Sequence, residues 1–362
     1  MEKLGVGIIG IGGVGINKCA GVKETPYLEL IGIAEINDQK REEVSKKFQV
    51  AGYKNYQELL KREDIQIIYN ATPNFLHAEI VVESLKSGKH VFSEKPMGLT
   101  REEIGKMLKA EKESGKYLQI NFEMRYSIMG KRIKEIVEAG EIGEVKNIFF
   151  IHCPGGAGFV KKEGDWRADP LKVGGYYLEE GCHRIDLFRY YMEEEIEEVE
   201  AIPAPELRGP GKWHRGYREP ACTLCFFPKE KLANLVTLQH RGVHPVLEPG
   251  MEHKLGHEFS TSLMGSEGSL RVDFWEKYIQ VLKFEEPFGY PSLKRTESYQ
   301  GISMYKLDHD SIGFFLDFAK RIIEGKKPFM SAEDSAKTMA VVFACEKSFN
   351  TGKREKVNYK FT

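Results

Sequence analysis

Residues 4–15 read LGVGIIGIGGVG, and this stretch decides the fold of the first half of the chain. The apolar run at 4–10 predicts a buried strand, and a helix is predicted at 13–23. The turn joining them fits the pattern Gly-x-Gly-x-x-Gly, in which glycines let the backbone approach a pyrophosphate held at the helix N-terminus. The residues of this turn are Gly10, Gly12, Gly13, Val14 and Gly15. The alternative is a tight turn that binds nothing.

Glu35 ends the next predicted strand, 20 residues after Gly15. From this position a carboxylate can accept hydrogen bonds from an adenosine ribose, and it would repel a 2′-phosphate. The pattern therefore favours NAD over NADP, although Lys40 and Arg41 lie nearby in the sequence.

Short apolar runs alternate with longer helical stretches up to about residue 121. This alternation is typical of a parallel sheet with right-handed crossovers, so we predict an α/β domain with a doubly wound sheet. Its strands are expected at 4–10, 28–34, 65–71, 90–93 and 117–121, and its helices at 13–23, 38–48, 74–87 and 100–114.

The pattern changes after a predicted helix at 127–139, because strands now follow one another without long helices between them. We therefore expect a second domain, residues 123–362, with an antiparallel or mixed sheet after a first domain at 1–122. The predicted strands are 144–152, 221–227, 232–239, 258–264, 268–274 and 278–284; two Gly/Pro-rich insertions lie at 203–220 and 240–257, and two final helices at 310–324 and 331–349.

Composition excludes several classes of protein. The 362 residues include 53 Lys and Arg against 54 Asp and Glu, a formal net charge of −1, and no basic run that would attract nucleic acid or an anionic membrane. No apolar stretch approaches the roughly 18–20 residues of a membrane span. A strand beginning at once leaves no room for a signal peptide, and six scattered cysteines form no disulfide framework, so we expect a cytoplasmic protein.

Two clusters follow predicted strands of the first domain. Ala71, Thr72, Pro73 and Asn74 with His77 follow one strand, and Glu94-Lys95-Pro96 follows the next. Ligands bind at the carboxyl ends of strands in open α/β sheets, so Lys95 is a candidate functional residue; a solvated surface lysine is the alternative.

A third cluster lies in the second domain, where Trp166-Arg167 and Gly174-Gly175 precede a predicted helix at 176–191. On a regular helix Glu179, His183 and Asp186 would share one face. A carboxylate one turn from an imidazole can fix its tautomer and stabilise its protonated form, as a proton acceptor in hydride transfer requires. The alternative is a half-buried helix whose histidine is hydrogen-bonded within the protein and has no catalytic role.

These segments in chain order, together with Arg125, Met264 to Leu270 and Thr351-Gly352, resemble the Gfo/Idh/MocA oxidoreductases over nearly the whole chain. The resemblance implies an N-terminal Rossmann domain, a C-terminal α/β domain with a large open sheet, and a nicotinamide cofactor in the cleft between them. It also implies that the last helix packs back on the first domain. The substrate it implies is a secondary alcohol or carbonyl of a sugar, sugar acid or cyclitol.

The resemblance also implies roles for individual residues. Lys95 would contact the reacting oxygen and His183 would be the general acid/base, with Glu179 beside it. Lys95-Pro96 is expected to be a cis peptide. The family usually has Asp where this chain has Glu179, which could orient His183, reach the substrate, or leave the orienting role to Asp186. The expected cofactor-binding residues are Gly10, Gly12, Gly13, Val14, Gly15, Glu35, Ala71, Thr72, Pro73, Asn74, His77, Glu94, Lys95, Trp166 and Arg167, and the expected substrate-binding residues are Lys95, Arg125, Tyr126, Glu179, His183 and Asp186.

His183 is the first choice of base, because an unperturbed imidazole titrates near about 6.5 whereas a lysine titrates near about 10.4. The positive oxidised ring beside Lys95 could lower the pKa of that amine, so the two roles could be exchanged.

Three weaker signals remain. Cys222 and Cys225 resemble half a zinc or redox motif, but residues three apart on a strand face opposite sides, so we expect core cysteines and no metal site. Of the histidines at 240, 244, 253 and 257, the last two have a spacing that a metal site could use, but they lie in a loop, so we expect solvated or interface histidines instead. Arg208, Arg215 and Arg218 with Trp213 and Tyr217 either frame an anionic or sugar-ring substrate or form an ordinary surface loop.

The leading hypothesis is an NAD-dependent dehydrogenase. A hydrolase or lyase that uses bound NAD for transient oxidation, and a non-catalytic dinucleotide-binding regulator, are the alternatives. An open sheet with an uncovered face predicts a homodimer or homotetramer.

Overall fold

The computed structural model describes residues 3–152, 165–204, 220–237, 258–274, 276–286 and 289–361. The chain divides into two compact units. Unit 1 contains Met1–Phe122, Ser311–Met339 and Lys360–Thr362, and unit 2 contains Glu123–Asp310 and Ala340–Tyr359. The first segment of unit 1 ends at the predicted boundary, and unit 1 also includes segments that the sequence analysis placed in the second domain.

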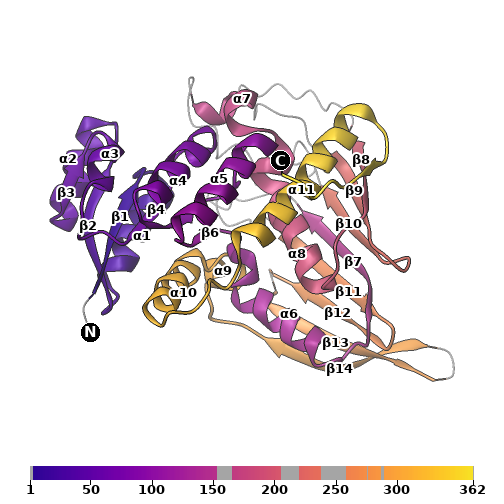
Figure 1. Cartoon of the computed structure of the whole chain (residues 1–362). Coiled ribbons are helices and arrows are strands. Elements are labelled where there is room, and N and C mark those ends of the chain that lie inside the picture. Colours follow the sequence, from indigo (N-terminus) through magenta and orange to yellow (C-terminus); the bar gives the residue numbers. More distant parts are fainter. Residues whose placement is uncertain are drawn as a thin grey trace, which may run out of the picture. The chain divides into compact units, whose positions relative to one another are not determined.

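Unit 1 is built on a six-stranded parallel sheet with the order β3-β2-β1-β4-β5-β6 (Figure 1). The chain leaves β1 toward β2 on one side, and β4 begins the return on the other. The crossovers therefore run in opposite directions, and in sheets of this topology ligands bind where the direction reverses, at the carboxyl ends of β1 and β4. The strands are β1 Leu4–Ile9, β2 Leu28–Ala34, β3 Ala51–Tyr53, β4 Ile67–Asn70, β5 His90–Ser93 and β6 Leu118–Ile120.

The helices of unit 1 confirm the predicted alternation. They are α1 Gly13–Lys23, α2 Asp38–Phe48, α3 Tyr56–Leu60, a 3-10 turn Asn74–Leu76, α4 His77–Lys86, α5 Arg101–Ser114 and α10 Ser311–Ile323. Thr100 and Glu103 form a capping box that fixes the start of α5. β3 and α3, which lie between α2 and β4, were not predicted.

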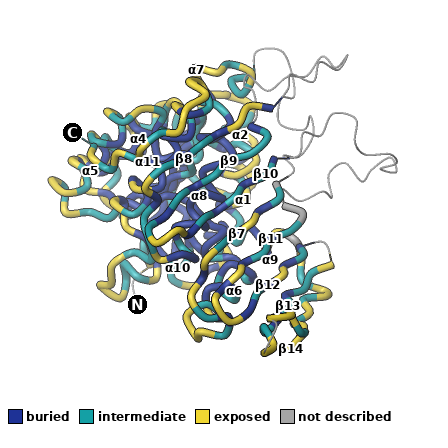
Figure 2. The backbone as a smooth tube through the Cα atoms, turned by 90° about the vertical axis from the view of Figure 1, so that its right-hand side faces the viewer, coloured by how far each residue is buried: buried dark blue, intermediate teal, exposed yellow. Residues whose placement is uncertain are grey.

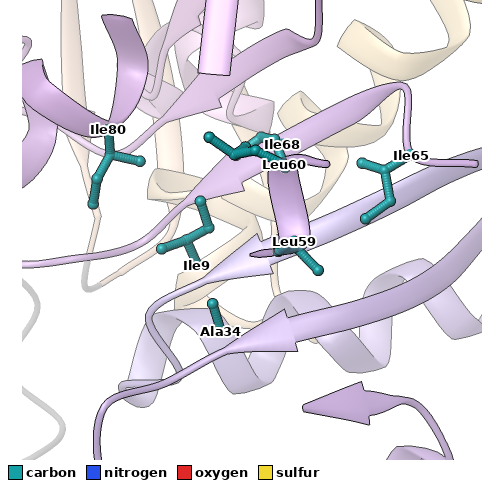
Figure 3. Close-up of a cluster of buried hydrophobic side chains, with 7 residues drawn as sticks. All are labelled: Ile9, Ala34, Leu59, Leu60, Ile65, Ile68 and Ile80. Carbon is teal, nitrogen blue, oxygen red and sulfur yellow. The ribbon is translucent and has the colours of Figure 1, made fainter. Parts of the chain in front are cut away.

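The core of unit 1 comes from the continuous apolar runs of its strands, as buried parallel strands require. Figure 3 shows one cluster in which Ile9 of β1 and Ile68 of β4 lie among side chains from the flanking helices; its members are Ile9, Ala34, Leu59, Leu60, Ile65, Ile68 and Ile80. A second, aromatic cluster packs Phe315 of α10 against Tyr69 and Phe92, with ring centroids 5.0 and 5.4 Å away. The late helix α10 thus completes the core of unit 1.

Unit 2 is built on a nine-stranded mixed sheet with the order β14-β13-β12-β11-β7-β10-β9-β8-β15. Its β7–β10 pair is parallel and the other pairs are antiparallel. The mixed sheet confirms the prediction, but β8, β14 and β15 were not predicted. The strands are β7 Val145–His152, β8 Glu198–Pro203, β9 Pro220–Phe226, β10 Leu232–Thr237, β11 Glu258–Gly265, β12 Gly268–Asp273, β13 Tyr278–Glu285, β14 Tyr290–Ser298 and β15 Glu355–Lys356.

Helix α8 packs on one face of this sheet. Phe150 of β7 is buried there, 5.0 Å from the ring of Phe188, whereas its neighbour Phe149 points to the other face and is 39% exposed. No residue of β14, at the edge, is buried (Figure 2). The helices of unit 2 are α6 Ile128–Glu138, α7 Pro170–Val173, α8 Cys182–Met192 and α9 Met304–Asp308, with 3-10 turns at Glu123–Arg125 and Trp166–Ala168 and a π-helical turn at Tyr177–Gly181.

The final helix, α11, runs from Ala332 to Thr351, so its first residues belong to unit 1 and its later residues to unit 2. Among the described residues, no helix combines the length and the apolar character that a membrane crossing needs.

Candidate functional site

The turn between β1 and α1 is closed by two of its glycines. Gly10 has φ +84°, and a Cβ there would lie 2.7 Å from the Ala71 carbonyl oxygen. A Cβ on Gly15 would lie 2.0 Å from the Gly10 carbonyl oxygen. By contrast, a Cβ on Gly12 or Gly13 would meet nothing within 4 Å. Gly10 and Gly15 therefore serve the tight turn, while Gly12 and Gly13 leave open space at its surface.

That open space lies at the N-terminus of α1. Gly12 is the N-cap, no side chain caps the helix, and the first turn carries no acidic residue. The first backbone N–H groups and the positive end of the helix dipole thus suit an anionic group. Val14, in this first turn, is 45% exposed.

Glu35 is fixed against the same turn by two backbone hydrogen bonds. Ile11 N–H donates to its Oε2 at 3.0 Å, and Asn37 N–H donates to its Oε1 at 3.0 Å. The carboxylate is thereby held where the sequence predicts an adenosine ribose. Arg41 donates to the main-chain oxygen of Glu35 and pairs with Asp38 at 2.7 Å, so its guanidinium already has protein partners.

The first strand-end cluster is organised by buried polar side chains. Asn70 donates to Ser93 Oγ at 3.1 Å and accepts from the Thr72 hydroxyl at 2.7 Å, which links the ends of β4 and β5. His77 is fully buried, with Nδ1 2.7 Å from the Pro96 oxygen and Nε2 2.9 Å from the Thr72 oxygen. His77 thus joins the two loops with its ring. Ala71, Thr72 and Pro73 are half-buried and Asn74 is buried.

The Glu94-Lys95-Pro96 segment follows β5, and its Lys95-Pro96 bond is cis, which confirms the prediction. Glu94 accepts hydrogen bonds from the Tyr69 hydroxyl and from Asn121 Nδ2, the latter at 3.0 Å. Part of the hydrogen-bonding capacity of the Glu94 carboxylate is therefore used within the protein. Lys95, the next residue, is half-buried.

The corresponding cluster of unit 2 begins at Gly174 and Gly175, both of positive φ. A Cβ on Gly175 would lie 2.8 Å from Glu346 Oε1, which also accepts a 3.2 Å hydrogen bond from Tyr177 N–H. Burial raises the pKa of Glu346 to about 7. Glu346, which sequence reasoning missed, thus anchors the start of the helical segment that carries Glu179 and His183.

This segment is not the regular helix that was predicted at 176–191. Its first turn is π-helical, and α8 begins only at Cys182. Such turns alter the angular spacing of side chains and occur often at functional sites. Glu179 lies 3.6 Å from Arg167 Nε, and Arg167 in turn stacks on Trp166, 4.3 Å from its ring centroid.

The carboxylate placed beside His183 is Glu123, whose Oε2 lies 3.9 Å from His183 Nδ1. Sequence reasoning missed Glu123 because nothing in its spacing links it to a helix 60 residues later. The ring of His309 lies on His183 with centroids 6.0 Å apart, and this contact was missed for the same reason. His183 itself is 3% exposed.

Arg125 and Asp186, both expected to bind substrate, form a buried ion pair with each other. Nε and Nη2 of Arg125 donate to the two carboxylate oxygens of Asp186 at 2.5 and 2.6 Å. The guanidinium also lies 4.9 Å from the ring centroid of Tyr190. This pairing favours a structural role over a ligand-binding one. Tyr126 is half-buried and stacks under the Lys131 ammonium at 3.7 Å.

The weaker sequence signals have separate outcomes. Cys225 is buried and Cys222 is half-buried on β9, and both are free thiols, which confirms the core assignment for Cys225. The region described contains no cluster of three or more potential metal ligands. The histidines at 240, 244, 253 and 257, and Arg208, Trp213, Arg215, Tyr217 and Arg218, lie outside the described residues.

Comparisons with known proteins cover both units. The profile "Oxidoreductase family, NAD-binding Rossmann fold" matches residues 4–122, and "GFO/IDH/MocA C-terminal domain" matches residues 131–271. Myo-inositol 2-dehydrogenase of Thermotoga maritima is 24% identical over 348 residues, 95% of each chain. The NAD-dependent scyllo-inositol 2-dehydrogenase of Bacillus subtilis is 23% identical over 350 residues, covering 95% of this chain and 94% of its own.

A solved structure of levoglucosan dehydrogenase in complex with NADH and levoglucosan superposes with a TM-score of 0.83 at 21% identity, covering 98% of this chain and 100% of its own. At that identity the likeness shows the fold. The fold, the glycine turn with Glu35, and the two matched profiles together show that this chain is a member of the Gfo/Idh/MocA oxidoreductase family with an NAD-binding Rossmann domain.

Proposed function

We propose that this oxidoreductase transfers a hydride between NAD and a secondary alcohol or ketone of a sugar, sugar acid or cyclitol, with Lys95 and His183 serving the reacting oxygen. The observation that carries the cofactor half is the fixation of the Glu35 carboxylate against the glycine turn by Ile11 N–H. The substrate class is supported by the inositol dehydrogenases among the relatives.

The residues present fit the dinucleotide. Gly12 and Gly13 leave room at the uncapped N-terminus of α1 for a pyrophosphate, and Glu35 offers acceptors to a ribose. Ile36, which is 80% exposed directly after Glu35, offers an apolar surface to an adenine ring. When bound, NAD supplies the hydride acceptor. A 2′-phosphate on the ribose, as in NADP, would be repelled by the Glu35 carboxylate.

Proton movement falls to the chain's own side chains. Oxidation of an alcohol requires a base within hydrogen-bond reach of its hydroxyl, and an imidazole near neutral pH suits that role. His183 Nε2 is our assigned acceptor, because Glu123 lies on the side of Nδ1. The Lys95 ammonium would donate a hydrogen bond to the same substrate oxygen and stabilise its developing negative charge. Glu179, Trp166 and Arg167 remain candidates for ligand contact, and Glu179 is held by Arg167.

We further propose a cytoplasmic homo-oligomer, a dimer or tetramer. The described cysteines are all free thiols, as in reducing compartments. Large apolar side chains lie exposed on strands of the nine-stranded sheet, among them Phe149, Ile202 and Met264, and a second copy could cover them.

The test is turnover. The purified full chain is incubated with NAD and a panel of inositols, aldoses, anhydrosugars and uronic acids while nicotinamide absorbance at 340 nm is followed. We expect reduction of NAD with at least one polyol, a loss of kcat of at least about 10²-fold in Lys95→Ala and His183→Ala, and wild-type rates in the exposed control Lys112→Ala.

Substrate conversion without net cofactor reduction would instead indicate transient oxidation by bound NAD. Binding of NAD with no conversion of any panel member would indicate a regulator. Full kcat in His183→Ala together with complete loss in Lys95→Ala would reverse the assignment of the base.

A further inference from the structure

Two ionisable side chains from distant parts of the sequence lie against His183 within unit 2, and a third holds one of them. Glu123, in the 3-10 turn before α6, lies 3.9 Å from Nδ1. His309, which follows α9, packs edge-on against the His183 ring with centroids 6.0 Å apart and planes at 73°. Asp308 holds His309, with 2.7 Å between its Oδ2 and His309 Nδ1.

Most of these groups are shielded from water. The exposed fraction is 3% for His183, 4% for Asp308 and 6% for Glu123, and the His309 side chain is 21% exposed. Charges that are shielded in this way interact over a few ångströms far more strongly than they would in solvent. A change of charge on any of them is therefore felt by the His183 ring.

His309 is a cation in this setting. Burial lowers the pKa of His309, but the attraction and hydrogen bond of Asp308, helped by Glu123, outweigh this and raise it to about 9. Arg184 opposes protonation of His309, and the buried Arg125–Asp186 ion pair carries no net charge.

The charges on Glu123, Arg184, Asp308 and His309 then sum to zero. Glu123 alone would favour a proton on His183, whereas the His309 cation opposes it. A separation of 3.9 Å is longer than a hydrogen bond, so the influence of Glu123 on His183 is that of its charge.

We propose that Asp308 and His309 are positioning residues for His183: the His309 cation, held in place by Asp308, disfavours a second positive charge on the adjoining ring and so keeps His183 in its neutral, proton-accepting form. This inference rests on the proposed role of His183 as base. It assigns a function to a pair that lies outside the segments carrying the family's motifs in this sequence.

The key variant is His309→Gln, which removes the cation and leaves Asp308 charged. We expect His183 to take up a proton more readily, so that the acid limb of the pH profile of kcat/KM for alcohol oxidation moves up by about one pH unit. His309→Lys retains a cation and should keep the limb within about 0.3 unit of wild type. Asp308→Asn/His309→Gln removes both charges and should return the limb most of the way.

A second readout does not depend on turnover. The ring protons of His183, assigned by their loss in His183→Asn, are titrated by NMR in the full chain, and the midpoint should rise in His309→Gln by the same amount as the acid limb. His90→Gln, which changes a half-buried histidine of unit 1, is the matched control and should move neither value. Circular dichroism confirms that each variant is folded.

An unchanged His183 midpoint in folded His309→Gln would overturn the inference, as would a double variant as strongly shifted as the single one. If wild type oxidises no panel substrate, the proposed function fails, while the NMR titration still decides whether His309 controls the charge on His183. If His309→Gln is unfolded, the comparison of His309→Lys with wild type and with the double variant decides in the same way.

Discussion

Asp186→Asn is expected to destabilise unit 2 without acting as a substrate-binding mutation. In the wild type the Asp186 carboxylate receives both hydrogen bonds of a two-point contact from Arg125, at 2.5 and 2.6 Å. The side chains are 1% and 8% exposed, so the substitution leaves a buried guanidinium with no counter-charge.

Breaking a buried pair from one side costs about 3–5 kcal/mol. For a unit of roughly 200 residues, where 1 kcal/mol corresponds to about 2–4 °C, the melting temperature should fall by roughly 10 °C. The measurement is thermal unfolding followed by circular dichroism, together with KM for a turned-over polyol at a temperature where the variant is folded. KM should change by less than about threefold.

Two further variants serve as controls. Glu135→Gln removes a carboxylate from an exposed pair with Arg132 and should cost less than about 1 kcal/mol. Arg125→Met/Asp186→Leu replaces the buried pair by apolar groups and should be more stable than Asp186→Asn. A variant Asp186→Asn that melts within about 2 °C of wild type but loses substrate affinity would refute the structural role and restore the ligand-binding one.

Three other outcomes follow from the geometry. Glu35→Ser should weaken NAD binding by about 10-fold or more and improve NADP binding, measured by fluorescence titration of both reduced cofactors, because it removes an anion and its hydrogen bonds from the ribose site; unchanged selectivity would contradict the placement of Glu35. Gly15→Ala should abolish dinucleotide binding, measured by calorimetry with NAD, since its Cβ would overlap the Gly10 carbonyl oxygen. Gly13→Ala should fold normally, since its Cβ would meet nothing within 4 Å. Glu346 has a pKa raised by burial to about 7, so the folded state holds a proton that the unfolded state loses above about 4.5, and stability falls as pH rises between these values. Relative to wild type, Glu346→Gln should therefore gain about 1–3 kcal/mol on going from pH 5 to pH 8 in urea unfolding, and an equal difference at both pH values would count against it.

The sequence predicted unit 1 well because its determinants are local. Continuous apolar strands and the glycine turn each depend on neighbours along the chain, and the bounds of β1, β2 and β5 agree with those expected within a residue. β14 escaped notice for a physical reason: it is an edge strand with no buried residue, so it carries no alternation of apolar and polar side chains.

The surroundings of His183 could not be predicted in the same way. The sequence offered Glu179 and Asp186 as partners for the imidazole, and only the fold shows that Asp186 is paired with Arg125 and that Glu123 lies beside His183. The π-helical turn before Cys182 further alters the spacing that a regular helix would have given Glu179 and His183. Side-chain pairs that join residues 60 or more positions apart leave no periodic trace in a single sequence.

The composition of unit 1 bears on how the protein is made. The sheet of unit 1 is complete by residue 122, but the aromatic cluster of its core also needs Phe315. Asn121 likewise needs Ser311, whose hydroxyl it contacts at 2.7 Å. The ribosome must therefore synthesise residues 123–310 before unit 1 can complete its core. Until then Tyr69 and Phe92 of the nascent chain lack the Phe315 ring that packs against them. A chain terminated before residue 311 would expose this apolar surface and would be a substrate for chaperones and proteases.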